Sequence, residues 1–512
     1  MTALQPTDFI HAEAGAGAEF QTAAPGVARH DVHPIDHHAP RALYFARPQI
    51  HPKQAHGTFR QVKWAVMAVT LGIYYALPWI RWNRGPDLPN QAVLLDLEHN
   101  RYFVFFLEIW PQEFYFVTGL LIMAALGLFL VTSVAGRVWC GYTCPQTVWT
   151  DLMIAVERCW QGDRNDRIKL DKQPWDVTKL YKKAMTHLSW LLVGLATGGA
   201  FVFYFHDAPT LARELATFSA PEAAYFFLAL FTLTTYVLGG LAREQVCIYM
   251  CPWPRIQGAM TDRHTLLIGY RPERGEPRGS HKKGETWLDR GDCVDCQACV
   301  AVCPTGIDIR DGSQLECIQC ALCIDACNDI MQKVGRPTNL IAYDTVAKQE
   351  ASSAGIHEPF RLIRPRTLMY AAALVLVCAI MLIAWLNRTL LEINVIHDRN
   401  PPFVQLSDGS VRNAYTVKLL NKRQEPRTLV LETQGLPGAS ISIIGAEPSD
   451  GRRVQVPTDD LREIRVLVSV PPAEIMKLQA ASTPFSLVLR DVENGTSNSR
   501  RTQFQTVQGR QP

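Results

Sequence analysis

The stretch that decides the fold spans residues 292–328 and reads DCVDCQACVAVCPTGIDIRDGSQLECIQCALCIDACN. It holds eight of the fourteen cysteines of the chain, arranged as two runs with the same C-x2-C-x2-C-x3-C spacing. A four-cysteine run that occurs twice indicates two metal centres of one kind. The first run consists of Cys293, Cys296, Cys299 and Cys303, and the second consists of Cys317, Cys320, Cys323 and Cys327.

Iron–sulfur chemistry explains this spacing, because a folded-back loop with three close cysteines and a fourth after a short gap suits a cubane cluster. In two-cluster proteins the fourth cysteine of each run binds the other cluster. The stretch resembles a bacterial ferredoxin domain over about forty residues. The predicted ligands of one 4Fe-4S cluster are Cys293, Cys296, Cys299 and Cys327, and those of the second are Cys303, Cys317, Cys320 and Cys323.

A zinc site and a disulfide framework are the alternatives for these cysteines. A structural zinc site needs one or two C-x2-C pairs with a tetrahedral spread, and disulfides need an oxidising compartment. Neither explains a duplicated four-cysteine run. The second run departs from the first in one respect, since Pro304 follows Cys303 whereas Asn328 follows Cys327. Proline is not a ligand, so this difference leaves the prediction of two clusters intact.

Long apolar segments predict a membrane protein with several domains, as expected for 512 residues. Each segment approaches or exceeds the ~20 residues that a helix needs to cross a bilayer. The alternative, five buried helices of a large soluble core, fits such lengths poorly. The net charge of +3 gives no argument for nucleic acid. The uncharged segments are 64–80, 114–136, 188–205, 223–242 and 367–387.

Basic residues between these segments predict the orientation in the membrane. Only Arg213 lies between the third and fourth segments, and acidic residues outnumber basic ones between the first and second. The positive-inside rule therefore places the amino terminus, 137–183 and 243–366 in the cytoplasm and the carboxyl-terminal region outside. No cysteine follows Cys378, which agrees with an outer domain free of thiols. The loop between the second and third segments carries Arg137, Arg158, Arg164, Arg167, Lys169, Lys172, Lys179, Lys182 and Lys183.

Two further cysteine pairs, here called the CxxxCP pairs, follow the second and fourth segments: Cys140 and Cys144 in RVWCGYTCPQTVW, and Cys247 and Cys251 in REQVCIYMCPWP. Side chains at i and i+4 of a helix lie close enough to share a metal or form a disulfide. The prolines after Cys144 and Cys251 predict a helix break at each. Four soft thiolates suit Cu(I), zinc or another cluster, and two thiol pairs can also cycle by disulfide exchange. Single cysteines such as Cys159 and Cys378 are instead interpreted as packing residues.

The two ends of the chain differ in pattern. Residues 1–60 hold seven of the fourteen histidines, including His30, His33, His37 and His38. Their composition favours a disordered tail, with a weak copper or zinc tether as the alternative. Beyond 387 the apolar residues follow a period of two, as in Ile464, Val466, Val468 and Val470, and about seven short strands over ~120 residues predict an immunoglobulin-like sandwich.

The predicted fold class is therefore a multi-domain membrane protein with five transmembrane α-helices, a cytoplasmic two-cluster ferredoxin domain and a carboxyl-terminal all-β immunoglobulin-like sandwich. The predicted domains are a disordered cytoplasmic tail (1–60), a four-helix membrane region with both CxxxCP pairs (61–259), a cytoplasmic ferredoxin-like domain (260–345), a linker with the fifth transmembrane helix (346–390), and a periplasmic sandwich (391–512).

Over roughly residues 40–512 these features resemble the CcoG (FixG, RdxA) family of cytochrome oxidase accessory proteins, on WCGYTCP, CIYMCPW and the two cluster runs. The resemblance implies a bacterial inner-membrane protein that acts in assembly of cbb3-type oxidases, in company with a copper-exporting P-type ATPase. It also implies a cupric reductase that receives electrons from an unidentified cytoplasmic donor. The residues that it marks as catalytic and as candidate copper ligands are Cys140, Cys144, Cys247 and Cys251.

Two rival functions stay open. The first is an oxidase assembly scaffold whose clusters are structural or sense redox state and whose sandwich docks a partner. The second is an electron-transfer subunit of a quinol-linked chain, because the membrane half also resembles polyferredoxin subunits. Quinone chemistry asks for a protonatable group in the membrane, for which His187 and His206 at segment ends give weak support.

Overall fold

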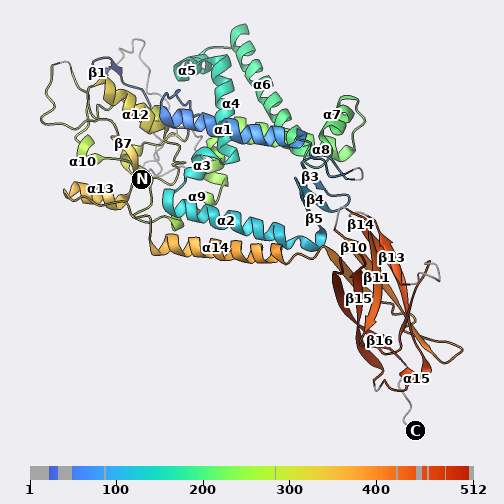
Figure 1. The fold of residues 1–512 in the computed structure, drawn as a ribbon. Coiled ribbons are helices and arrows are strands. Elements are labelled where there is room, and N and C mark those ends of the chain that lie inside the picture. Colours follow the sequence, from blue (N-terminus) through green and yellow to red (C-terminus); the bar gives the residue numbers. More distant parts are fainter. Residues whose placement is uncertain are drawn as a thin grey trace, which may run out of the picture. The chain divides into compact units, whose positions relative to one another are not determined.

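The computed structural model describes residues 22–32, 49–85, 88–282, 284–422, 425–445, 452–457, 460–478 and 480–506 (Figure 1). The chain divides into two compact units, each considered by itself. The first contains Met1–Asn83 and Pro89–Met381, and the second contains Arg84–Leu88 and Leu382–Pro512. The histidines at positions 33, 37 and 38 lie outside the described residues.

Four helices in the described part of the chain are long and apolar enough to cross a membrane. They are α2 (Tyr115–Ala135), α6 (Val177–Val202), α8 (Glu222–Thr235) continued by the π-helical segment η3 (Tyr236–Ala242), and α14 (Pro365–Leu386). They overlap the second to fifth predicted segments, although α6 begins well before the third, which spans 188–205. The first segment, 64–80, begins in α1 (Thr58–Ala76) and runs beyond its end; α1 is not among these four and carries the buried Arg60 and Lys63 near its start.

Shorter helices connect and flank these spans. Glycines let α6 and α8 approach closely, since a Cβ on Gly198 would lie 2.9 Å from the carbonyl oxygen of Leu228.

After α1, the chain forms a three-stranded antiparallel sheet of β3 (Val93–Asp96), β4 (Arg101–Val104) and β5 (Leu107–Ile109). The connecting helices are η1 (Leu77–Trp79), η2 (Pro111–Glu113), α3 (Val138–Tyr142), α4 (Pro145–Gln161), α5 (Arg164–Lys172), α7 (Ala208–Ala216), the π-helical η4 (Val246–Met250) and α9 (Trp253–Met260).

The cysteine-rich stretch folds around two short helices and one strand pair, with the first helix in the first run and the second beginning in the second run. These are α11 (Ala298–Ala301), α12 (Leu322–Lys333), and the antiparallel β6 (Leu267–Tyr270) and β7 (Ile341–Asp344). Buried side chains from all four elements share one apolar core. The remaining elements of this region are α10 (Pro272–Gly275), η5 (Ile309–Asp311) and α13 (Val346–Ser353).

The amino-terminal region is not disordered throughout, which corrects the expectation for 1–60. The hairpin of β1 (Thr22–Ala24) and β2 (Val27–Ala28) packs Ala23, Ala24 and Val27 into the core around the cysteine runs. The backbone N–H of His30 also donates to the carbonyl oxygen of Cys296 at 2.9 Å. Composition alone missed this hairpin because its burial depends on a distant partner surface.

The second unit is an antiparallel sandwich, as predicted for the carboxyl-terminal region. One sheet has the order β12-β14-β10-β8, with β9 beside β10, and the other has the order β13-β11-β15-β16. Alternate residues such as Tyr415, Val417 and Leu419 are fully buried between them. The elements are β8 (Leu391–His397), β9 (Val404–Gln405), β10 (Val411–Asn421), β11 (Arg427–Gln434), β12 (Ser440–Ile443), β13 (Arg453–Val456), β14 (Asp460–Val470), α15 (Pro472–Ile475), β15 (Ser482–Asp491) and β16 (Ser497–Gln505).

Candidate iron–sulfur and thiol sites

The eight cysteines of the two runs line two cavities. The first cavity is lined by Cys293, Cys296, Cys299 and Cys327. The second cavity is lined by Cys303, Cys317, Cys320 and Cys323, and also by Cys299. Each fourth cysteine thus lies at the cavity of the other run, which is where the ferredoxin pattern places it.

The backbone repeats the same unusual geometry in both runs. Asp295 and Gln297 flank Cys296 with φ of 50° and 58°, and Gln319 and Ala321 flank Cys320 with φ of 56° and 61°. Left-handed residues are uncommon outside glycine, and such turns point backbone N–H groups at an anionic ligand. The duplicated sequence therefore folds into two equivalent loops that orient amide donors toward their thiols.

The thiols are buried among apolar side chains, and this burial decides their protonation. Burial raises the pKa of Cys317 to about 12, and the neighbouring Cys303 adds to the shift. Burial likewise raises the pKa of Cys327 to about 12, reinforced by Cys296. Such thiols become thiolates when bound iron supplies the compensating positive charge.

The donor set fits two cubane clusters. Each cavity presents four soft thiols in a mostly apolar setting, which is the ligand set of a 4Fe-4S cluster. A cubane spreads its four thiolates over four iron atoms, whereas tetrahedral zinc gathers them at one point. The arrangement favours clusters over zinc.

The second cysteine of each CxxxCP pair lies at a break between helices. Cys140 lies within α3, and Cys144 is the N-cap of α4, whose first residue is Pro145. Cys247 lies in η4, and Cys251 ends that segment in an extended conformation. The breaks predicted at Cys144 and Cys251 are present. The π-helical segments that precede Cys251 have no counterpart in the sequence-based expectations.

The four thiols of the CxxxCP pairs gather in one region without closing around one ion. Burial, reinforced by Cys144, Cys140 and Cys251, raises the pKa of Cys247 to about 12, so the thiols are electrostatic neighbours. The Cys140 thiol donates to Oε1 of the fully buried Gln257 at 3.2 Å, and Gln257 donates to Thr132 at 3.2 Å.

The second cavity adjoins the first CxxxCP pair. Cys140 packs in one buried cluster with Ile318 and Cys320. The backbone N–H of Arg137 donates to the side-chain oxygen of Gln319 at 2.7 Å, and its guanidinium donates to the carbonyl of Leu315. The loop that carries the second cysteine run is therefore held directly against α3.

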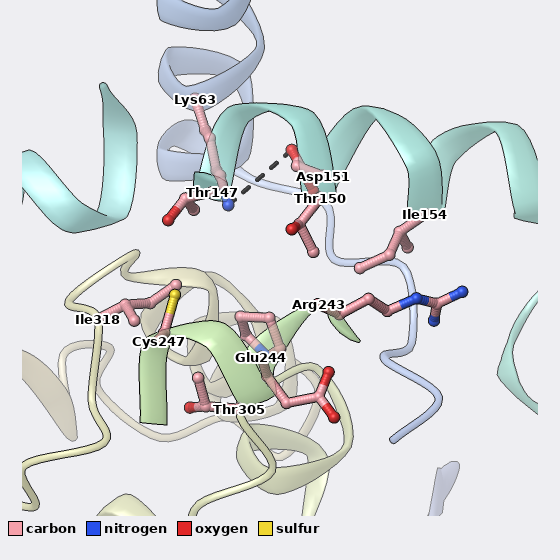
Figure 2. Close-up of a pocket in the computed structure, with 11 residues that line it drawn as sticks. Lys63, Thr147, Thr150, Asp151, Ile154, Arg243, Glu244, Cys247, Thr305 and Ile318 are labelled. Atoms are coloured by element: carbon pink, nitrogen blue, oxygen red, sulfur yellow. Dashed lines mark ion pairs between the residues drawn. The ribbon is translucent and has the colours of Figure 1, made fainter. Parts of the chain in front are cut away.

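A third cavity, here called the membrane-side cavity, separates α1 and α4 from the second run (Figure 2). Both Lys63 and Cys247 point into it. Lys63 Nζ lies 3.9 Å from Asp151 Oδ2, and Arg60 donates to both oxygens of Asp151 at 2.9 Å. Although burial opposes its ionisation, the two cations hold the pKa of Asp151 below its usual value.

Sequence reasoning missed Gln257, Lys63 and Asp151 because their partners are remote along the chain. Runs of cysteine carry a local spacing, whereas a single glutamine or aspartate in an apolar helix carries none. The presence of a buried charge in such a helix is the one signal available for Lys63 and Asp151. The two histidines of the quinone hypothesis lie apart from these cavities: His187 Nδ1 pairs with the Tyr236 hydroxyl at 2.9 Å, and His206 follows α6.

Comparison with family models matches three regions of the chain. Residues 117–160 match a "4Fe-4S binding domain", 242–346 match a "4Fe-4S dicluster domain", and 381–506 match an "IG-like fold at C-terminal of FixG". The dicluster match begins before the second CxxxCP pair and so includes Cys247 and Cys251. The chain is thus an iron–sulfur protein with apolar helices suited to a membrane, which supports electron transfer.

Named relatives match nearly the whole chain. The "Nitrogen fixation protein FixG" of Rhizobium meliloti is 51% identical over 479 residues, covering 88% of this chain and 91% of that protein. "Protein RdxB" of Cereibacter sphaeroides is 51% identical, covering 89% and 95%, and "Protein RdxA" of the same organism is 50% identical, covering 84% and 91%. With half of its residues identical to theirs over such coverage, the chain belongs to the family of FixG, RdxA and RdxB.

Proposed function

We propose that the chain is a membrane-bound electron-transfer protein that reduces Cu(II) to Cu(I) during assembly of a cbb3-type cytochrome c oxidase. In this proposal α1, α2, α6, α8 with η3, and α14 cross the bacterial inner membrane. The ferredoxin-like domain is cytoplasmic and the sandwich is periplasmic, which the basic residues of 137–183 support. The proposed recipients of Cu(I) are a copper-exporting P-type ATPase and the oxidase itself.

The observation that carries the proposal is the packing of Cys140 against Ile318 and Cys320. It brings a soft thiol of the first CxxxCP pair into the same buried cluster as Ile318 and Cys320, two residues that line the second cavity. Cys247 lies at the membrane-side cavity, which Ile318 also lines. A metal ion held by the CxxxCP thiols is thus a neighbour of the iron–sulfur ligands.

The chemistry is a one-electron reduction of the substrate ion, Cu(II) + e⁻ → Cu(I). The clusters, held by the eight cysteines of the two runs, supply single electrons when they have been reduced by a cytoplasmic donor. The CxxxCP thiolates retain the product because soft sulfur ligands favour Cu(I). Reduction and capture therefore occur at the same residues.

Binding of copper requires thiolates, and the protein fixes where the protons are held beforehand. Cys247, with a pKa of about 12, is protonated at neutral pH. The Cys140 proton is held by Oε1 of Gln257. Copper therefore displaces protons as it binds.

The test uses purified full-length protein with its clusters reduced by dithionite and the excess reductant removed. Cu(II) is then added, and cluster reoxidation is followed by visible absorption while Cu(I) is followed with a colorimetric chelator. We expect one Cu(I) for each electron lost by the clusters. Clusters that stay reduced in the presence of Cu(II) would contradict the reductase function and leave the assembly-scaffold function.

The CxxxCP pairs are tested with the double variant Cys247→Ala, Cys251→Ala. We expect copper reduction to be lost while iron content and the cluster spectrum stay as in the wild type. The matched control is Cys378→Ala, because Cys378 lies in α14 and takes no part in the site. Full activity of the double variant would place copper elsewhere.

A further inference from the structure

A buried charged group lies between the membrane helices and the second cysteine run. Arg60 and Lys63 of α1 both pair with Asp151 of α4. Their side chains are only 8%, 4% and 9% exposed, respectively. Two cations against one carboxylate leave this group with a net positive charge that solvent does not screen.

This group faces the second cavity. The membrane-side cavity that Lys63 and Asp151 line is closed on its far side by Thr305 and Ile318 (Figure 2). The Thr305 hydroxyl lies 3.3 Å from the sulfur of Cys303, and Ile318 lies between Cys317 and Cys320 in the chain.

The position of Lys63 is fixed by the cysteine-bearing domain itself. Asp325, which lies between Cys323 and Cys327 in α12, accepts hydrogen bonds from the backbone N–H groups of Phe59 and Arg60 at 3.2 and 2.7 Å. These are first-turn amides of α1, so Asp325 caps that helix and holds it at a defined distance from the second run. The start of α1, which carries Lys63, cannot move away without breaking the cap.

The first cavity has a different electrostatic setting. The buried Arg310 lines it, and the Arg310 guanidinium binds both Asp308 and Asp295 at 2.6 Å. One cation is thus shared by two carboxylates, the reverse of the ratio in the group of Arg60, Lys63 and Asp151. A cluster gains one negative charge on reduction, so neighbouring positive charge stabilises its reduced form.

We propose that Lys63 and Asp151 tune the reduction potential of the second cluster, Lys63 raising it and Asp151 lowering it. Neither residue contacts the substrate, and both act through the cluster ligands. The net positive charge of the group favours an electron on the cluster beside Cys140. This inference rests on the ligand assignment used in the proposed function and is independent of copper.

The experiment is an EPR-monitored redox titration of the full-length protein with both clusters bound. Lys63→Met is expected to lower one of the two midpoint potentials, and Asp151→Asn is expected to raise the same one. We expect about a tenfold change in the reduction equilibrium for each, which is 59 mV for a one-electron couple. Lys63→Arg, which keeps the charge, is the matched control and leaves both potentials close to those of the wild type.

The opposite signs separate tuning from a merely structural role, since loosened packing would shift both variants in one direction. Wild-type midpoint potentials in all three variants would overturn the inference, and so would shifts of the same sign in Lys63→Met and Asp151→Asn. If Lys63→Met does not fold, the absence of a rise in midpoint potential in Asp151→Asn is enough to overturn it. A Cys296→Ala background keeps only the second cluster and identifies which potential moves. Loss of both clusters in that background would instead contradict the ligand assignment.

Discussion

Gly141 and Ile318 lie so close that a Cβ on Gly141 would sit 2.8 Å from the carbonyl oxygen of Ile318. Gly141 follows Cys140, and Ile318 follows Cys317, so this contact sets the distance between a CxxxCP thiol and the second cysteine run. We expect Gly141→Ala to push α3 away from the loop. Copper reduction by chemically reduced protein should then slow at least several-fold while iron content is retained, as measured by stopped-flow cluster reoxidation.

The matched control for that variant is Gly127→Ala in α2, where a Cβ would meet nothing within 4 Å. Alanine is the better helix former, so this change should be neutral or slightly stabilising. Wild-type reoxidation rates in Gly141→Ala would show that close packing of α3 is not needed for electron transfer.

The fourth cysteine of each run lies at the cavity of the other run, so removing Cys327 and removing Cys303 should affect copper reduction differently. Cys327→Ala removes a ligand of the first cavity, and Cys303→Ala removes one of the second. Each should lose about half of the iron. With dithionite as reductant, Cys327→Ala should still reduce Cu(II), because the cluster beside Cys140 remains, whereas Cys303→Ala should not. The reverse result would mean that the first cluster, and not the second, passes the electron to copper.

Glu157 pairs with two buried arginines in the first compact unit. Its Oε2 accepts from Arg167 at 2.7 Å and from Arg243 at 2.9 Å, and its side chain is 3% exposed. Glu157→Gln keeps the shape but leaves two buried guanidinium groups without a counter-charge. Breaking such a buried pair costs about 3–5 kcal/mol, so thermal unfolding in detergent should begin at a markedly lower temperature.

The exposed pair of Asp329 and Lys333 provides the control, because Asp329→Asn should change stability by about 1 kcal/mol or less. An unfolding temperature of Glu157→Gln equal to that of the wild type would show that the two arginines find other partners.

The same carboxylate gives a pH dependence. Burial opposes ionisation of Glu157, but Arg243 and Arg167 outweigh it and lower its pKa below the usual 4.5. A depressed folded-state pKa means that the stabilisation is complete above about pH 4.5 and is lost as the pH falls through the folded value. The difference in unfolding temperature between wild type and Glu157→Gln should therefore be constant at neutral pH and shrink in acid.

The orientation in the membrane is tested by labelling intact cells with an impermeant maleimide. Residues of the sandwich include no cysteine, so Ser499→Cys on the exposed face of β16 introduces a single target there. We expect Ser499→Cys to gain label over the wild-type background. Gln332→Cys, exposed at the end of α12, should gain label only after the cells are opened. Labelling of Gln332→Cys in intact cells would reverse the proposed orientation.

Local patterns explain why much of the fold was predictable from sequence. The spacing of each cysteine run encodes a loop that folds on itself, and period-two residues such as Val417 and Leu419 encode the sandwich strands. Apolar length likewise identified α2, α6, α8 and α14. The five-helix prediction depended on α1, which length and composition do not distinguish from a helix partly buried against the cysteine domain.

Long-range contacts explain what the sequence did not reveal. Asp151 and Lys63 meet only because α1 and α4 pack together, and neither residue belongs to a spaced motif. Gln257 reaches Cys140 across 117 positions. The π-helical turn at η3, where the N–H of Arg243 donates to the carbonyl of Leu238, likewise reflects packing that apolar composition does not encode.

The cap that Asp325 forms on α1 links cluster binding to the protein's resistance to proteolysis. Asp325 is two residues from Cys323 and two from Cys327, so the loop that positions its carboxylate is shaped by the metal ligands themselves. Clusters bound to those ligands would hold α12 in shape, so we expect their loss to loosen the cap and expose the start of α1 to proteases.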